Sequence, residues 1–72
     1  MEKITINTEF IKLDQLLKYA GICGSGAEAK AWITEGRVRV NGAAEDRRGK
    51  KIRDGDVVEV EGTEYVVSRD RS

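Results

Sequence analysis

The sequence has 72 residues, enough for one small domain, and a core of this size cannot enclose a deep catalytic cleft. It contains no histidine and a single cysteine, which excludes a disulfide within the chain and a metal site built on cysteines. Thirteen basic and thirteen acidic residues cancel to a net charge of zero.

The charges are unevenly distributed along the chain. Residues 30–53 carry eight basic and three acidic side chains, a local charge of +5, whereas residues 54–72 carry two basic and six acidic ones, a charge of −4. Because the local potential decides what a surface attracts, the basic segment is a candidate for binding an anionic partner. No apolar run is long enough for a signal peptide or a membrane span, so we expect a cytoplasmic protein without a membrane partner.

The first predicted elements are a strand and a helix. Residues 3–6 alternate polar and apolar side chains, as a half-buried strand does, and a polar link follows them. The next apolar residues fall on one face of a helix, at Leu13, Leu16, Leu17 and Ala20. Gly21 comes at the position that favours a left-handed helix end.

A second helix is predicted to begin at Ser25. Ser25 and Glu28 form a capping box, in which each side chain accepts a hydrogen bond from an amide of the first turn. Ala29, Trp32 and Ile33 give an apolar face, and Gly36 ends the helix. Since few residues separate the two helices, we expect them to pack as a compact pair, with Trp32 in the core and Cys23 as an inert, buried thiol.

Beyond Gly36 the apolar period changes from 3.6 to 2, which predicts strands. Val38 and Val40 point to one side of the first strand, and Arg37 and Arg39 to the other. The dipeptide at residues 41–42, Asn-Gly, is a strong signal for a hairpin turn.

The last third of the chain is predicted to form a second hairpin. Ile52 is an isolated apolar anchor before a turn at residues 54–56, and residues 57–61 and 64–67 then read as two strands joined at Gly62-Thr63. The predicted fold class is therefore α+β, with two short helices packed on a small, mostly antiparallel β-sheet.

Cations cluster on the predicted β-ribbon and the loop after it. They are Arg37 and Arg39 on the strand, and Arg47, Arg48, Lys50 and Lys51 in the loop. Guanidinium groups suit paired contacts with phosphate oxygens, and lysines add point charges. The alternative is a solvated surface whose cations pair with Glu45, Asp46 and neighbouring acids.

Two other motifs are better interpreted as structural than as cofactor or metal sites. Residues 24–29 match the dinucleotide pattern G-x-G-x-x-A, but a helix rather than a strand precedes them and no βαβ unit fits. An RNA phosphate at this turn stays an open alternative. Asp54 and Asp56 supply too few oxygens for calcium, so we interpret them as turn residues. We expect no metal, no small-molecule cofactor and no enzymatic activity.

Together these residues resemble a known family, the S-four RNA-binding domain, also called the αL motif and named after the fourth protein of the small ribosomal subunit. Its members read R-L-D-x-x-L, a glycine, S-R-x-x-A-x-x-x-I-x-x-G-x-V-x-V-N-G and later G-D. The likeness covers residues 12–60. The matching residues are Lys12-Leu13-Asp14, Leu17, Gly21, Ser25, Ala29, Ile33, Gly36, Val38, Val40, Asn41, Gly42 and Gly55-Asp56.

The resemblance implies RNA binding through the helix pair and the adjoining β-ribbon. Carried onto matching positions, the contact residues are Lys12, Ser25, Lys30, Arg37 and Arg39. Arg47, Arg48, Lys50 and Lys51 join them by charge alone, in a cluster similar to that of small stand-alone bacterial members. The chain departs from the pattern where Lys12 and Gly26 replace arginines, which removes one guanidinium fork and one RNA contact.

We therefore expect residues 1–72 to form a single, monomeric, non-catalytic RNA-binding domain. Its expected partner is structured RNA, ribosomal, tRNA-like or another folded non-coding RNA, with the ribosome as a setting. The alternative is a protein-interaction module that uses the acidic hairpin at residues 57–65 and the basic ribbon. The residues alone do not separate RNA from DNA.

Overall fold

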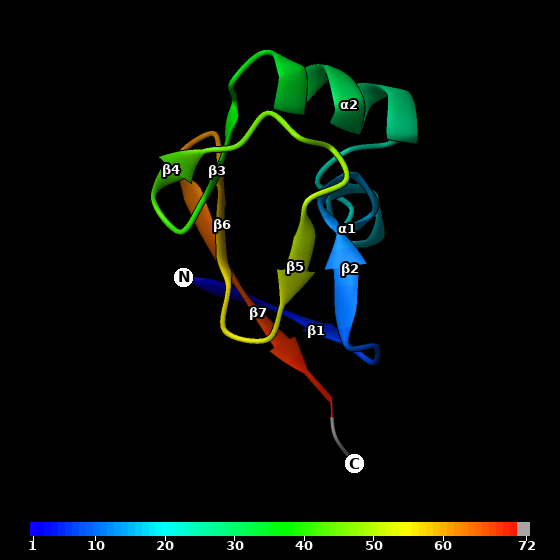
Figure 1. The fold of residues 1–72 in the computed structure, drawn as a ribbon, viewed down its shortest axis with the longest axis vertical. Coiled ribbons are helices and arrows are strands. Elements are labelled where there is room, and N and C mark those ends of the chain that lie inside the picture. Colours follow the sequence, from blue (N-terminus) through cyan, green and yellow to red (C-terminus); the bar gives the residue numbers. More distant parts are fainter. Residues whose placement is uncertain (71–72) are drawn as a thin grey trace.

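The computed structural model describes residues 1–70, and within them the chain forms two helices and seven strands. In chain order these are β1 (Glu2–Ile6), β2 (Phe10–Lys12), α1 (Leu13–Tyr19), α2 (Gly26–Thr34), β3 (Val38–Val40), β4 (Ala43–Ala44), β5 (Lys51–Arg53), β6 (Val57–Val60) and β7 (Thr63–Arg69). Helix α2 lies across one end of the molecule, and α1 follows directly from β2 (Figure 1). The predicted α+β class is confirmed. Neither helix has the length and apolar character needed to cross a membrane.

Five strands form the main sheet in the order β1-β7-β6-β3-β4. The β1–β7 pair is parallel, while the β7–β6, β6–β3 and β3–β4 pairs are antiparallel, so the predicted mostly antiparallel sheet is confirmed. Strands β2 and β5 form a separate antiparallel ribbon. The expected polar link before α1 is therefore wrong for Phe10–Lys12, which pairs with a segment far along the chain.

Local hydrogen bonds mark the end of α1 and the start of α2. Gly21 has a φ of 75° after α1, and the amides of Ile22 and Cys23 both donate to the Leu17 carbonyl at 3.0 Å. At the start of α2, Ser25 Oγ accepts from the Glu28 amide at 3.2 Å, as the predicted capping box requires. The Glu28 carboxylate accepts from the amide of Gly24 at 3.3 Å, one residue before the expected donor.

Left-handed residues make the two hairpin turns. Asn41 and Gly42 have φ values of 52° and 85°, which confirms the predicted turn between β3 and β4. In the second hairpin the turn residues are Glu61 and Gly62, at 51° and 82°. The predicted turn at Gly62-Thr63 is wrong by one residue, because Glu61 adopts a backbone conformation that non-glycine residues rarely take.

The core lies between the main sheet, the β2–β5 ribbon and the helix pair. Its fully buried side chains include Leu16 and Leu17 of α1, Ile33 of α2, Ile52 of β5 and Val58 of β6. Cys23 is buried, as predicted. Burial raises the pKa of its thiol by desolvation, and the negative charge of Glu28 adds to this effect. Trp32 is only half-buried and packs on the edge of this core, not inside it as expected.

Candidate nucleic-acid interface

The loop at residues 45–50 is attached to the start of α1 by two backbone hydrogen bonds. The amide of Leu13 donates to the carbonyl of Lys50 at 2.9 Å, and that of Asp14 donates to the carbonyl of Arg48 at 3.1 Å. The first amides of a helix have no acceptor within the helix, so the loop supplies what α1 lacks. These bonds hold the most basic part of the chain beside Lys12.

The β2–β5 ribbon places further cations next to that loop. Phe10 lies opposite Arg53 and Lys12 opposite Lys51, while Ile52 between them is buried. Because directly opposite residues of a ladder share a face, the Phe10–Arg53 and Lys12–Lys51 pairs lie on the exposed side of the ribbon.

An aromatic ring organises two of these cations. The Lys51 Nζ lies 4.8 Å from the centroid of the Phe10 ring, and the Arg53 guanidinium carbon lies 5.4 Å from it. Both distances are within the range of cation–π attraction. Arg53 is also paired with Glu9 at 3.5 Å. Phe10 and Arg53 were not predicted as site residues. Arg53 belongs to the basic segment at residues 30–53, whereas no local sequence pattern indicates Phe10.

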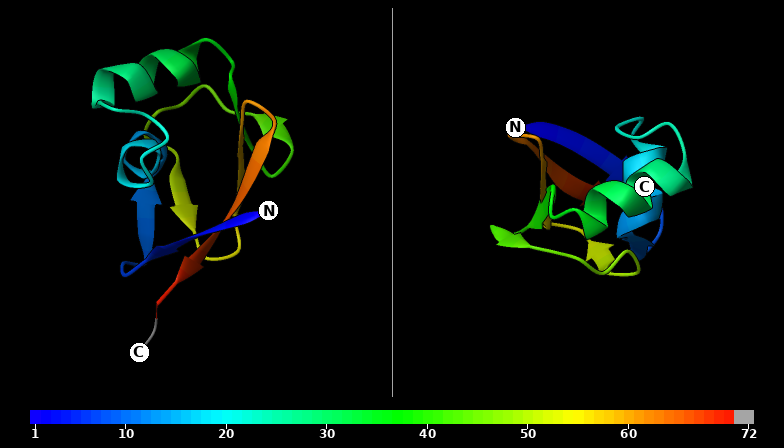
Figure 2. Two further views of the ribbon diagram at one scale, coloured as in Figure 1. Left: turned by 180° about the vertical axis from the view of Figure 1, so that it is seen from behind. Right: turned by 90° about the horizontal axis from the view of Figure 1, so that it is seen from above.

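The elements that carry these cations lie on one side of the molecule. Strand β4, the loop at residues 45–50 and strand β5 face the viewer in Figure 1, and β1 lies on the opposite side, as the view from above in Figure 2 shows. We call the side chains carried there by the loop and the ribbon the basic surface. It consists of Lys12, Arg47, Arg48, Lys50 and Lys51.

The cations of the basic surface differ in whether a carboxylate of this chain pairs with them. Arg47 donates from Nε and from an Nη to the two carboxylate oxygens of Glu45, at 2.9 and 3.1 Å. These hydrogen bonds lower the pKa of Glu45 and raise that of Arg47. Within residues 1–70, the side chains of Lys12, Arg48 and Lys50 form no hydrogen bond or ion pair. The alternative of paired cations therefore holds for Arg47. It holds in part for Lys50, whose charge also lowers the pKa of Glu45, and not for Lys12 and Arg48.

Arg37 pairs with two carboxylates, one more than Arg47 does. It lies outside β3, which begins at Val38. Its guanidinium binds the carboxylate of Glu61, lies 3.4 Å from that of Glu35 and stacks 4.2 Å from the centroid of the Trp32 ring. The hydrogen bond to Glu61 raises the pKa of Arg37. Arg37 thus links the end of α2 to the β6–β7 hairpin, and its charge is largely balanced.

The remaining predicted contact residues lie on other elements. Arg39 is exposed in β3, between Ala44 and Glu59 of the flanking strands, and no described residue forms a hydrogen bond or ion pair with its side chain. Lys30 is exposed on α2. The hydroxyl of Ser25 is used to cap α2. No contact joins these three side chains to the basic surface.

The aspartates of the turn after β5 serve the backbone, as predicted. Asp56 accepts from the amide of Arg53 at 2.8 Å and from the side-chain amide of Asn41 at 3.2 Å. Asp54 accepts from the amide of Arg69 at 2.9 Å. Among residues 1–70, no three side chains of histidine, cysteine, aspartate or glutamate are arranged to hold a metal ion.

The fold agrees with the comparison to known families. Residues 4–68 match the S4 domain. The chain belongs to the S4 domain family. The resemblance noted in the sequence is confirmed, and the expected motif core at residues 12–60 lies inside the matched segment of this S4 domain.

Two bacterial relatives of this S4 domain are similar over most of their length. RlbA of Bacillus subtilis (strain 168), named a probable ribosome maturation protein, is 49% identical over 59 residues, which are 82% of this chain and 83% of RlbA. YbcJ of Escherichia coli (strain K12) is 46% identical over 52 residues, which are 72% of this chain and 74% of YbcJ.

A solved structure supports the same assignment. The solution structure of YbcJ from Escherichia coli, described as revealing an αL motif involved in RNA binding, superposes with a TM-score of 0.72. It is 38% identical to this S4 domain, and the superposition covers 94% of this chain and 87% of YbcJ. The helix pair and mixed sheet described above are thus the αL fold.

Proposed function

We propose that this S4 domain binds structured RNA, ribosomal or another folded non-coding RNA, and catalyses no reaction. YbcJ shares its fold and is described as carrying a motif involved in RNA binding. RlbA is named for ribosome maturation, which favours ribosomal RNA as the partner class. The family is one of binding domains, which favours a non-catalytic role.

The observation that carries the proposal is the attachment of the basic loop to α1. The hydrogen bonds from Leu13 and Asp14 to the loop fix its backbone, so Arg48 and Lys50 are held next to the Lys12–Lys51 pair before any RNA binds. A cation array that is already in place loses less conformational entropy on binding than a flexible basic tail does.

The proposed contacts are with phosphates. Lys12, Arg48, Lys50 and Lys51 neutralise the backbone, and the helix pair matches the shape of an RNA helix, whose deep groove excludes side chains. Arg39 and Lys30 lie on β3 and α2, away from the basic surface, and are not counted among these four phosphate contacts. Arg37 and Arg47 contribute less because Glu61 and Glu45 already balance their charges.

Salt dependence tests this function directly. With about four phosphate contacts, the logarithm of the binding constant for an RNA hairpin falls against the logarithm of salt concentration with a slope of about −3 to −4. Affinity that does not change with salt contradicts the proposal. Crosslinking in cells followed by sequencing of the attached RNA then identifies the transcript.

A protein partner is the second candidate, and one observation favours it. Glu59 and Glu64 lie directly opposite each other on the β6–β7 hairpin, where like charges cost stability. Arg39 of this chain lies opposite Glu59 on the other side, so Glu64 is the carboxylate that a cationic partner would approach. A binding partner that stays attached after nuclease treatment, and is released by Glu64→Gln, would support a cationic protein on this face.

A further inference from the structure

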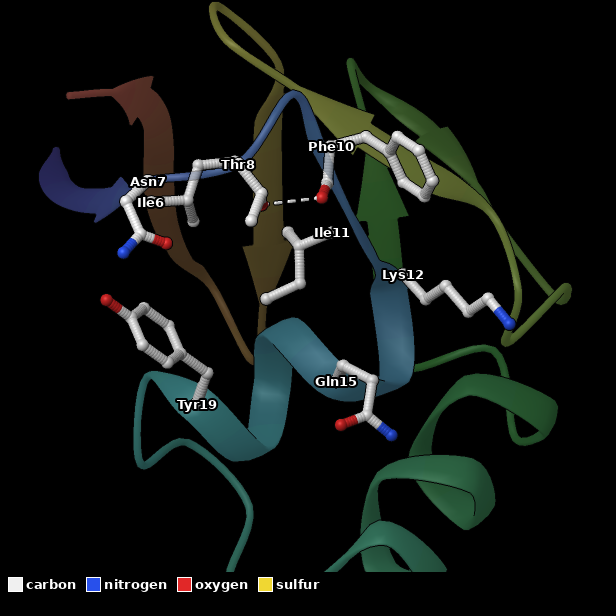
Figure 3. A pocket seen from close by; sticks show the side chains of 8 residues that line it. All are labelled: Ile6, Asn7, Thr8, Phe10, Ile11, Lys12, Gln15 and Tyr19. Atoms are coloured by element: carbon white, nitrogen blue, oxygen red, sulfur yellow. Dashed lines mark hydrogen bonds between the residues drawn. The ribbon is translucent and has the colours of Figure 1, made fainter. Parts of the chain in front are cut away.

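An open hollow lies beside the basic surface, between the β1–β2 connection and α1 (Figure 3). Its volume is about 370 Å³, near the lower end of the range for small-ligand sites. Side chains of three kinds line it, apolar, aromatic and amide or hydroxyl. They include Ile6, Ile11, Tyr19, Asn7, Thr8 and Gln15.

One wall of the hollow is a flat ring held in place. The side chain of Tyr19 is the most exposed aromatic group in the described residues, with 62% of the residue accessible to solvent. Its hydroxyl nevertheless donates to the carbonyl of Thr5 at 2.9 Å, which ties the ring to β1. Facing it are the apolar side chains of Ile6 and Ile11 (Figure 3). An exposed, fixed ring beside an apolar floor is a stacking surface.

Two side-chain amides complete the hollow. Asn7 and Gln15 lie on different sides of it (Figure 3), and neither side-chain amide hydrogen bonds to another of residues 1–70. Each amide offers both donors and an acceptor, which are the groups that the edge of a nucleobase also presents. An unpaired base combines a flat apolar face with such an edge.

Lys12 connects the hollow to the basic surface. It lines the hollow at its edge, and its side chain extends away from Tyr19 (Figure 3). In the ribbon it lies opposite Lys51. A nucleotide with its base in the hollow therefore has its phosphate near two cations. An apolar peptide side chain of similar size would use the apolar floor but neither the amides nor Lys12.

We propose that this hollow binds one unpaired nucleobase next to the RNA helix that the basic surface contacts. The site rests on the proposed function and adds to it a class of target, an RNA helix with an unpaired nucleotide at its end or in a bulge. Base stacking on Tyr19 and hydrogen bonds from Asn7 and Gln15 supply affinity that does not depend on salt.

The test compares two RNA hairpins with the same stem, one blunt and one with a three-nucleotide unpaired tail. The wild-type protein binds the tailed RNA more tightly, by about 5- to 150-fold for one stacked base. Tyr19→Ala abolishes this preference and leaves the affinity for the blunt hairpin unchanged, since Tyr19 is not part of the basic surface. Tyr19→Phe keeps the ring but loses the hydrogen bond to Thr5, so it retains most of the preference if stacking is the main contribution.

Gln15→Ala is a second variant at an exposed position, and it changes which base is preferred in the tail even if Tyr19→Ala fails to fold. Equal affinity of the wild-type protein for both hairpins overturns the inference, as does a tail preference that both variants retain unchanged. Neither result affects salt-dependent binding of the blunt hairpin, whose absence would instead overturn the proposed function.

Discussion

Arg48 offers the sharpest test of the proposed interface. Its carbonyl accepts from Asp14 in the bond that fixes the loop, while its side chain forms no hydrogen bond or ion pair with the rest of residues 1–70. Arg48→Gln therefore removes one available cation and keeps the backbone contact. We expect the folded structure to be unchanged and one phosphate contact to be lost.

The size of the effect follows from counting the available cations. Four phosphate contacts, by Lys12, Arg48, Lys50 and Lys51, give a slope of about −3.6, so that affinity falls about 150-fold between 50 and 200 mM salt. With three contacts the slope is about −2.7, and the same change in salt lowers affinity about 40-fold. Titrations of a labelled RNA hairpin at several salt concentrations, followed by fluorescence anisotropy, resolve this difference.

Lys3→Gln is the matched control. It makes the same change in net charge, but Lys3 is exposed on β1, on the opposite side of the molecule from the loop (Figure 2). We expect its slope to equal that of the wild-type protein. If Arg48→Gln and Lys3→Gln lower affinity and flatten the slope to the same degree, overall charge rather than a localised surface governs binding, and the reasoning is refuted.

Three further predictions concern stability and reactivity. Ser25→Ala removes the cap of α2, which costs about 1 kcal/mol, and lowers the Tm by about 4–8 °C in a thermal melt; an unchanged Tm contradicts the capping role. Because Arg47 lowers the pKa of Glu45 in the folded state, their contribution to stability is complete above the unfolded-chain pKa of about 4.3 and is lost as the pH falls through the lower folded value. Glu45→Gln therefore makes the free energy of unfolding in urea less dependent on pH in that acid range, and identical profiles for both proteins would speak against the pair. Cys23, which is 2% exposed, reacts with a thiol reagent only as fast as the protein opens, so rapid labelling of the native protein would contradict its burial.

Local patterns predicted the helices and hairpins because their causes lie within a few residues. The spacing of Leu13, Leu16 and Leu17 and the glycine after α1 specify that helix without reference to the rest of the chain. The same is true of the Asn41-Gly42 turn. The errors arose where pairing is distant. Strand β2 has only three residues and two adjacent apolar side chains, so it has no period, and its partner β5 lies far along the sequence.

In the candidate site, too, features set by local sequence were predicted and features set by distant contacts were not. Charge density alone predicted Arg48, Lys50 and Lys51, because a local run of cations needs no tertiary information. The neutralisation of Arg37 was not predictable in this way, since its partner Glu61 is 24 positions away and meets it only after the β6–β7 hairpin forms. Neither was the hollow beside Lys12, because its lining includes the residues of the missed strand β2.

The parallel pairing of β1 with β7 has a consequence for how the chain folds during its synthesis. Within residues 1–70, β1 is the first element to be synthesised and β7 is the last. At about 5–20 residues added per second, β7 follows β1 by roughly 3–12 seconds. During this interval Ile4 and Ile6 have no neighbouring strand to cover them, and the loop that must close is the longest in the domain. Native pairing of β1 is therefore delayed until β7 emerges, whereas the β2–β5 ribbon and the β3–β4 hairpin can form earlier.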